Sequence, residues 1–167
     1  FRRSDADGPI VNLLSSGAIM QEAIMAADKL SALGMAVNIW SITSFTELTR
    51  NGVNVDRSNR LNNETHKSYV EKLFENEQGV FVAATDYLKS LALGIEKWIP
   101  GHYEVLGTDG FGLSESRPDV RKHFEVDAGS ILQAAIYSLL QKSYIDTAMY
   151  QRCLELLRSP AGKADSA

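Results

Sequence analysis

The residues best suited to chemistry lie in one short loop, VLGTDGFGLSESR, at positions 105–117. Glycines at positions 107, 110 and 112 alternate there with hydroxyl and carboxylate side chains, and an arginine ends the stretch. A glycine-rich loop binds phosphate when a helix begins directly on the glycines, and in many nucleotide sites a lysine follows them. No lysine follows these glycines, and the pattern predicts no helix on them. We therefore interpret the loop as a sharp turn in which glycine supplies backbone freedom.

Short polar side chains also follow each predicted strand. They stand at Ser15-Ser16-Gly17, Thr43-Ser44, Thr85-Asp86 and Thr108-Asp109. Ligands of open parallel sheets bind beyond the carboxyl ends of the strands, so this edge could hydrogen-bond a polar ligand or another subunit. The same residue types are the favoured helix N-caps, and a helix is predicted directly after three of the four. Capping is the favoured interpretation, and an independent module that binds a small anion at this edge is the alternative.

The chain lacks the residue spacings of common nucleotide and metal sites. The first strand–helix turn has one glycine, Gly17, where a dinucleotide fingerprint has three, and no phosphate-loop motif occurs. His66, His102 and His123 have no partner at metal-ligand spacing. We interpret His123 as a helix-end residue, with proton transfer as the alternative. The single cysteine, Cys153, is predicted to be an ordinary helix residue because no activating partner accompanies it.

Composition excludes several classes of partner. The 167 residues are 44% hydrophobic and 23% charged, which is typical of a soluble globular domain with one core. The net charge of −4 gives no basic face for nucleic acid or an anionic membrane. No apolar run is long enough to span a bilayer, and the first residues lack the apolar core of a signal peptide. We expect a cytoplasmic protein without nucleic-acid or membrane partners and, since the sequence does not begin with methionine, a fragment of a longer chain.

Hydrophobic patterning predicts an α/β fold. Buried strands are expected at residues 10–14, 37–42, 80–84 and 103–106. The run 80–84 is apolar on both faces, as in a central parallel strand. Helical patterns follow each strand at short intervals, which indicates a mainly parallel sheet with helices on both faces.

The pattern predicts some helices clearly and leaves one segment without a clear helical pattern. The spacing of Ser44 and Glu47 is that of a capping box, and Asn51-Gly52 is expected to end the helix that it opens. Residues 53–63 are polar and weakly patterned, with asparagines that interrupt any long helix, so short turns of helix and loop are expected there. Helices are predicted near residue 117 and over 127–141 and 145–157, and Trp40 and Trp98 fall at core positions.

Four stretches carry a resemblance to a known enzyme family. They are GTDGFGLS at 107–114 with Arg117 and HFEVDA at 123–128, NLLSSGAI at 12–19, IWSITSFTEL at 39–48 and AATDYLK at 83–89. Each alone is a weak signal. In this order and spacing they resemble the homodimeric, thiamine diphosphate-dependent first component of the bacterial pyruvate dehydrogenase complex.

The resemblance implies a fold and a place in a longer subunit. In that family these stretches belong to the last of three domains, a transketolase C-terminal-like domain. Its three α/β/α layers surround a mainly parallel, five-stranded mixed sheet with one antiparallel strand. Residues 1–158 would form this single domain, with residues 1–4 as the remnant of the antiparallel edge strand. Residues 159–167 would be a flexible tail.

The resemblance also implies that the chemistry lies outside this chain. Thiamine diphosphate, magnesium and the proton-transferring histidines would belong to the two preceding domains, so this chain should hold no cofactor and be inactive alone. The whole enzyme would decarboxylate pyruvate and reductively acetylate a lipoyl group. The implied partners are the preceding domains of the same subunit, a second identical subunit and the dihydrolipoyl acetyltransferase component.

Within this frame, the glycine-rich loop becomes a subunit or domain boundary, with Thr108, Asp109, Phe111, Ser114 and Arg117 as its candidate interface residues. Two departures from the family stand out. Leu113 replaces an arginine that is usual there, which removes a possible anion-binding side chain. Residues 55–63 lack the usual tryptophan, methionine and His-Pro pair, so we expect this segment to pack differently.

Overall fold

The protein is built on a twisted five-stranded sheet. The computed structural model describes residues 2–3, 7–110 and 117–158. The strands are β1 (Arg2–Arg3), β2 (Ile10–Ser15), β3 (Ala36–Ser41), β4 (Val80–Ala84) and β5 (His102–Leu106), in the order β1-β3-β2-β4-β5. Strands β2 to β5 are parallel, and β1 pairs antiparallel with β3. The α/β class, the mixed sheet and the antiparallel edge strand are confirmed, whereas the flexible-tail prediction concerns residues outside those described.

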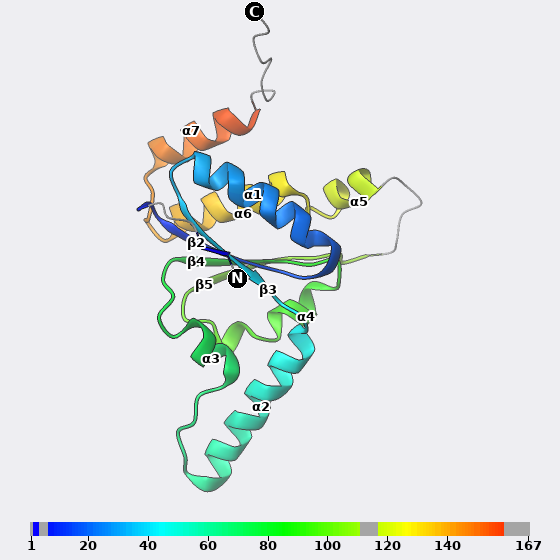
Figure 1. Cartoon of the computed structure of the whole chain (residues 1–167), viewed down its shortest axis with the longest axis vertical. Coiled ribbons are helices and arrows are strands. Elements are labelled where there is room, and N and C mark those ends of the chain that lie inside the picture. The colour runs from blue at the N-terminus through cyan, green and yellow to red at the C-terminus, as the bar shows by residue number, and fades with distance from the viewer. Residues whose placement is uncertain (1, 4–6, 111–116, 159–167) are drawn as a thin grey trace, which may run out of the picture.

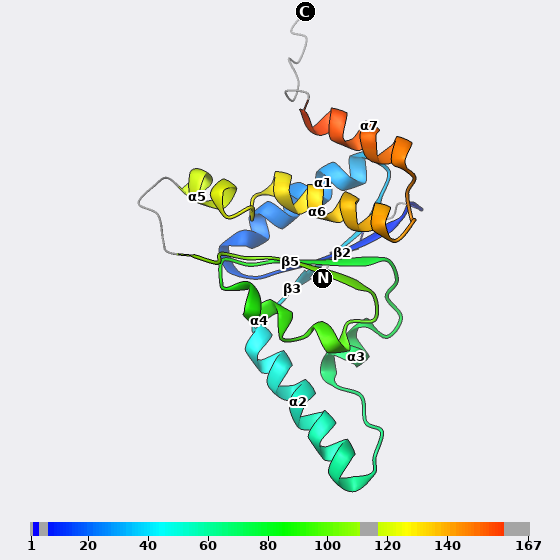
Figure 2. The ribbon, with the colours of Figure 1, turned by 180° about the vertical axis from the view of Figure 1, so that it is seen from behind.

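Helices cover both faces of this sheet (Figures 1 and 2). The first layer holds α1 (Met20–Ala32), α5 (Arg117–His123), α6 (Ala128–Gln141) and α7 (Thr147–Arg158). The second layer holds α2 (Phe45–Asn62), α3 (Tyr69–Phe74) and α4 (Lys89–Leu93). Short 3-10 turns, η1 (Gly17–Ile19) and η2 (Glu96–Trp98), complete the described elements. The helices predicted near 117, over 127–141 and over 145–157 are therefore confirmed as α5, α6 and α7.

Each layer buries its own apolar cluster against the sheet. On the first, Val11, Leu13 and Val82 pack with the inward faces of α1 and α6, which include Ala27 and Ile136. On the second, Leu14 and Phe81 pack with Phe74 and with both tryptophans. Successive strand residues point to opposite faces, so an apolar run such as Val80–Ala84 feeds both clusters. Trp40 and Trp98 are core residues, as predicted.

The predicted helix stop at Asn51-Gly52 is wrong. Helix α2 continues to Asn62, and Gly52 is buried within it. A Cβ atom at Gly52 would lie 2.5 Å from the Trp98 ring, so glycine is needed there for the close approach of the indole. Asn51 Oδ1 accepts a hydrogen bond from the Tyr69 backbone N–H at 2.8 Å and ties α2 to α3. The two residues interpreted as a stop signal are contact residues of a long helix.

The expectation of short turns and loop over 53–63 fails for a related reason. Asn59 donates to the His66 carbonyl at 2.8 Å and accepts from the His66 N–H at 2.9 Å, so the segment after α2 folds back along the helix. Asn63 ends the helix in the left-handed conformation, with φ of 53°. Asn59 thus binds the returning chain, and neither it nor Asn54 interrupts the helix.

A buried polar cluster joins β2, β3 and the turn before β4. Asn12 is fully buried; its Nδ2 donates to the Gln78 carbonyl at 2.8 Å, and its Oδ1 accepts from Asn38 and Trp40 at 3.0 and 3.1 Å. Asn12 and Asn38 lie side by side in the β2–β3 register. Asn38 also donates to Glu77 Oε2 at 3.1 Å. The sequence analysis did not identify this cluster.

Candidate functional site

The glycine-rich loop packs on the loop that follows β4. Thr108 donates its hydroxyl to the Asp86 carbonyl at 2.7 Å and its N–H to the Tyr87 carbonyl at 3.0 Å. Asp109 Oδ1 accepts from the Lys89 N–H at 3.0 Å, at the start of α4. Thr108 and Asp109 thus join two loops at the carboxyl edge. Phe111, Leu113 and Ser114 lie outside the described residues, and Arg117 begins α5.

The two described glycines of this loop, Gly107 and Gly110, are needed for different reasons. Gly110 adopts φ of 146°, as expected for a turn that favours glycine. At Gly107 an added Cβ would lie 2.8 Å from the Tyr87 carbonyl oxygen and 2.9 Å from the Lys89 nitrogen, so the reason is close backbone approach. Both reasons are structural, which supports the interpretation of the loop as a turn.

Capping explains fewer of the polar residues than predicted. Ser44 does cap α2, accepting from the Glu47 N–H at 3.2 Å. Ser16 makes no capping bond, and its hydroxyl lies 3.1 Å from that of Thr85. The N-cap of α4 is Leu88, so the prediction that Thr85-Asp86 caps that helix is wrong. The complete capping box is at Ser68 and Glu71, which the sequence analysis missed.

The edge residues instead hydrogen-bond one another and the neighbouring strands. Ser15 donates to the Ala84 carbonyl at 3.0 Å, and the Ile42 N–H donates to the Ser15 carbonyl at 2.8 Å. A hollow of about 230 Å³ opens beside them, lined by Ser16, Ile42, Thr43, Ser44, Phe45, Thr46, Tyr87 and Leu91. None of its described lining residues is cationic, and the Asp86 carboxylate lies beside Gly17 at the same edge. Such an environment disfavours the binding of an anion. It therefore argues against the alternative of an independent module that binds a small anion at this edge.

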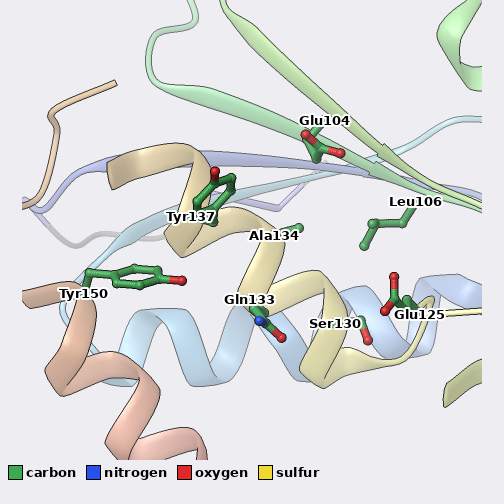
Figure 3. A pocket seen from close by; sticks show the side chains of 8 residues that line it. All are labelled: Glu104, Leu106, Glu125, Ser130, Gln133, Ala134, Tyr137 and Tyr150. Atoms are coloured by element: carbon green, nitrogen blue, oxygen red, sulfur yellow. The ribbon is translucent and has the colours of Figure 1, made fainter. Parts of the chain in front are cut away.

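A larger pocket of about 410 Å³ lies on the other side of the sheet, between β5, α6 and α7 (Figure 3). Its lining combines two carboxylates with hydroxyl, amide and apolar groups: Glu104, Leu106, Glu125, Ser130, Gln133, Ala134, Tyr137 and Tyr150. The Tyr137 and Tyr150 ring centroids are 6.4 Å apart. Glu125 adopts φ of 56° just before the start of α6, which sets its position at the pocket rim. The lining offers hydrogen-bond acceptors but neither a cation nor a nucleophile–base pair.

A half-buried ion pair links the helices beside this pocket. Glu22 on α1 contacts Arg121 on α5 at 2.6 Å and accepts from the Ala128 N–H, the first residue of α6, at 2.9 Å. The exposed fractions of the Arg121 and Glu22 side chains are 24% and 11%. Sequence reasoning missed the pair, although a glutamate on the inward face of an apolar helix was a usable signal. Its effect is to fix α5 and the end of the glycine-rich loop against α1.

The surroundings of Cys153 and His123 are those of packing residues. Cys153 is a fully buried residue of α7, as predicted for a helix residue, and burial raises the pKa of its thiol. A raised thiol pKa lowers the fraction of reactive thiolate. His123 is the last residue of α5, with its ring 5.0 Å from that of Phe124 in an edge-to-face arrangement. Neither residue is part of a reactive constellation.

The described residues do not fit thiamine diphosphate or its metal. No three of their His, Cys, Asp and Glu side chains are placed to hold a metal ion. The described lining of the 410 Å³ pocket has two carboxylates and no cation, and that of the 230 Å³ hollow has neither, whereas a diphosphate needs cations or a metal beside it. Within 2–3, 7–110 and 117–158, no helix is both long and apolar enough to cross a membrane.

Comparison with known proteins places the chain in a family. The model of the transketolase-like TK C-terminal domain matches residues 1–127. The chain belongs to this family. The transketolase-like domain is also similar to curated proteins named pyruvate dehydrogenase E1 component. That of Pseudomonas aeruginosa is 42% identical over 140 residues, covering 81% of this chain and 16% of the relative.

Two further relatives bear the same name. The Buchnera aphidicola protein is 46% identical over 130 residues, covering 75% of this chain and 14% of its own length. The Escherichia coli K12 protein is 41% identical over 140 residues, covering 81% of this chain and 16% of its own length. A solved split-gene transketolase, an inactive beta4 tetramer, covers 94% of this chain at 17% identity and a TM-score of 0.49. The transketolase-like domain therefore spans a small part of its curated relatives, and the family expected from the sequence is confirmed.

Proposed function

We propose that this chain is the C-terminal domain of a pyruvate dehydrogenase E1 component, and that it supports the architecture of the subunit and its dimer. The observation that carries the proposal is the 42% identity over 140 residues to an E1 component of which the chain spans only 16%. The internal bonding of the carboxyl edge agrees with a structural role, because its polar groups are engaged by neighbouring strands and loops.

The whole enzyme would decarboxylate pyruvate and reductively acetylate a lipoyl group of the dihydrolipoyl acetyltransferase component in the cytoplasm. Thiamine diphosphate, bound with magnesium in the preceding domains, supplies the carbanion stabilisation that the reaction needs. The residues of this chain would not touch the reacting atoms. Their contribution would be to hold the preceding domains and the second identical subunit in place, with residues 1–158 acting as one domain.

The test compares the full-length gene product with the 167-residue chain. With thiamine diphosphate, magnesium and an artificial electron acceptor, the full-length protein should oxidatively decarboxylate pyruvate, and the isolated chain should show no turnover. A full-length protein lacking this domain should lose its dimer in analytical ultracentrifugation. Turnover by the isolated chain, or an intact dimer without the domain, would contradict the proposed role.

A further inference from the structure

An exposed apolar surface lies between α2 and α4, next to the carboxyl edge. Four of the seven residues from Tyr87 to Leu93 are large, apolar and exposed: Tyr87, Leu88, Leu91 and Leu93. Val53 on α2 is also exposed. Single exposed apolar residues are normal, but a contiguous group marks an interaction surface. We name the group of Val53, Tyr87, Leu88, Leu91 and Leu93 the α2–α4 surface.

Two hollows meet on this surface. The 230 Å³ hollow at the carboxyl edge and a second of about 310 Å³ between α2 and α4 share Thr46 and Leu91 in their linings. The second hollow is also lined by Thr49, Arg50, Val53 and Gly94, among others. A Cβ at Gly94 would lie 2.5 Å from Thr49 Oγ1, so α2 and the end of α4 are in direct contact beside this hollow. Concavities between elements that are already packed together receive side chains of a partner at low entropic cost.

The path of the chain indicates what covers this surface. Strand β1 is antiparallel to β3, and Arg2 pairs with Ile39 while Arg3 pairs with Asn38. Chain joined to the amino end of β1 would therefore run toward the carboxyl end of β3. The segment after β3, from Ile42 to Thr46, lines the first hollow. The Pseudomonas relative has 84% of its length outside the 16% matched here, so a gene product of similar length would supply a large partner within one polypeptide.

We propose that the α2–α4 surface docks the remainder of the same polypeptide, whose side chains pack on these exposed apolar residues and fill the two hollows. This inference rests on the proposed function, since it requires that the native gene product be longer than this chain. The carboxyl-edge hollow, which has no cation among its described lining residues, would then receive a side chain of the docked segment.

The test is site-specific alkylation in the full-length protein, mapped by mass spectrometry. Leu91→Cys reports the shared wall of the hollows, and Leu156→Cys is the matched control, an exposed leucine on α7 in the opposite layer. Buried Cys153 gives a slow background. Each rate is divided by that of the same site in the urea-unfolded protein. Leu91→Cys should then react about tenfold or more slowly than Leu156→Cys, because docking removes reagent access.

The outcomes separate the alternatives. Equal normalised rates at the two sites would overturn the docking inference and leave the proposed function standing. Protection of Leu91→Cys that disappears when the dimer is diluted would assign the surface to a second copy and would also overturn it. If Leu91→Cys does not fold, Leu93→Cys on the same surface replaces it. A gene product no longer than this chain would overturn the proposed function itself.

Discussion

Gly52 shows how one missing side chain can determine how two elements pack. The α2 helix carries it against the Trp98 ring, and an added Cβ would meet that ring at 2.5 Å. Gly52→Ala should therefore destabilise the fold by about 1–3 kcal/mol through overpacking, although alanine is the better helix former by about 1 kcal/mol. Urea unfolding measures the change. Asn54→Ala, an exposed substitution on the same helix, is the control and should change stability by less than about 0.5 kcal/mol.

A single residue, Tyr103, should also make the stability of the fold depend on pH. Its buried hydroxyl donates to the Ala92 carbonyl at 2.9 Å, and burial, aided by the charge of Glu96, raises the pKa of Tyr103 above its ordinary value of 10.0. The folded state therefore favours the neutral phenol. Its stabilising contribution is complete below pH 10, the unfolded value, and is lost as the pH rises above it.

Tyr103→Phe makes this measurable. Near pH 8 the wild type should be more stable by about 1 kcal/mol, the net value of the hydrogen bond. Above pH 10 the difference should shrink by about 1.4 kcal/mol per pH unit, because only the wild type gains from ionisation on unfolding. Parallel stability curves for the two proteins between pH 8 and 11 would contradict the assignment.

At the element scale, α2 is held at its far end by one side chain. Asn59 forms two hydrogen bonds with the His66 backbone, whereas Asn62 bonds only Ser58 within its own helix. Asn59→Ala should speed amide exchange over residues 62–68 by about tenfold or more, since it removes two bonds each worth about 1 kcal/mol. Asn62→Ala is the matched control. Similar exchange in the two variants would show that the returning segment is held by other contacts.

The same helix shows where prediction from sequence succeeds and fails. The parallel strands could be predicted because each is a short apolar run, and the runs alternate with amphipathic helices. The length of α2 could not be predicted, because asparagine and glycine are unfavourable in helices unless a partner outside the helix contacts them. The partner of Gly52, Trp98, lies far along the chain, and the partner of Asn59, His66, lies beyond the end of the helix. The same applies to Asp109, whose carboxylate meets the start of α4 twenty residues earlier in the chain.

At the scale of the molecule, the two layers share one sheet and should unfold together. Both tryptophans lie in the second layer, so their fluorescence reports that layer alone, whereas circular dichroism reports all helices. Glu22→Ala, in the first layer, should cost about 1–3 kcal/mol, because it removes the carboxylate that pairs with half-buried Arg121 and accepts from the Ala128 N–H. The unfolding transitions of this variant measured by tryptophan fluorescence and by circular dichroism should shift by the same amount.

The control for this test is an exposed ion pair in the second layer. Glu47 and Arg50 contact each other at 3.0 Å with more than half of each side chain exposed, so Glu47→Ala should cost less than about 1 kcal/mol. A fluorescence transition that stayed in place while the circular dichroism transition of Glu22→Ala moved would mean that the layers unfold separately. That result would also contradict the proposal that residues 1–158 act as one domain.

The buried amides of Asn12 and Asn38 bear on how the sheet avoids misalignment. Apolar residues dominate the centre of β2 and β3, and valine, leucine and isoleucine would pack acceptably in several alignments. Only the native alignment places the two amides side by side, with Trp40 and the Gln78 carbonyl in reach. A slip by one residue would turn one amide toward the opposite apolar layer. Both buried amides would then lack hydrogen-bond partners, at a cost of about 1–3 kcal/mol for each amide. The cluster thus penalises slipped sheets more than it strengthens the correct one, and replacing both asparagines by valine would relax that selection even where stability is kept.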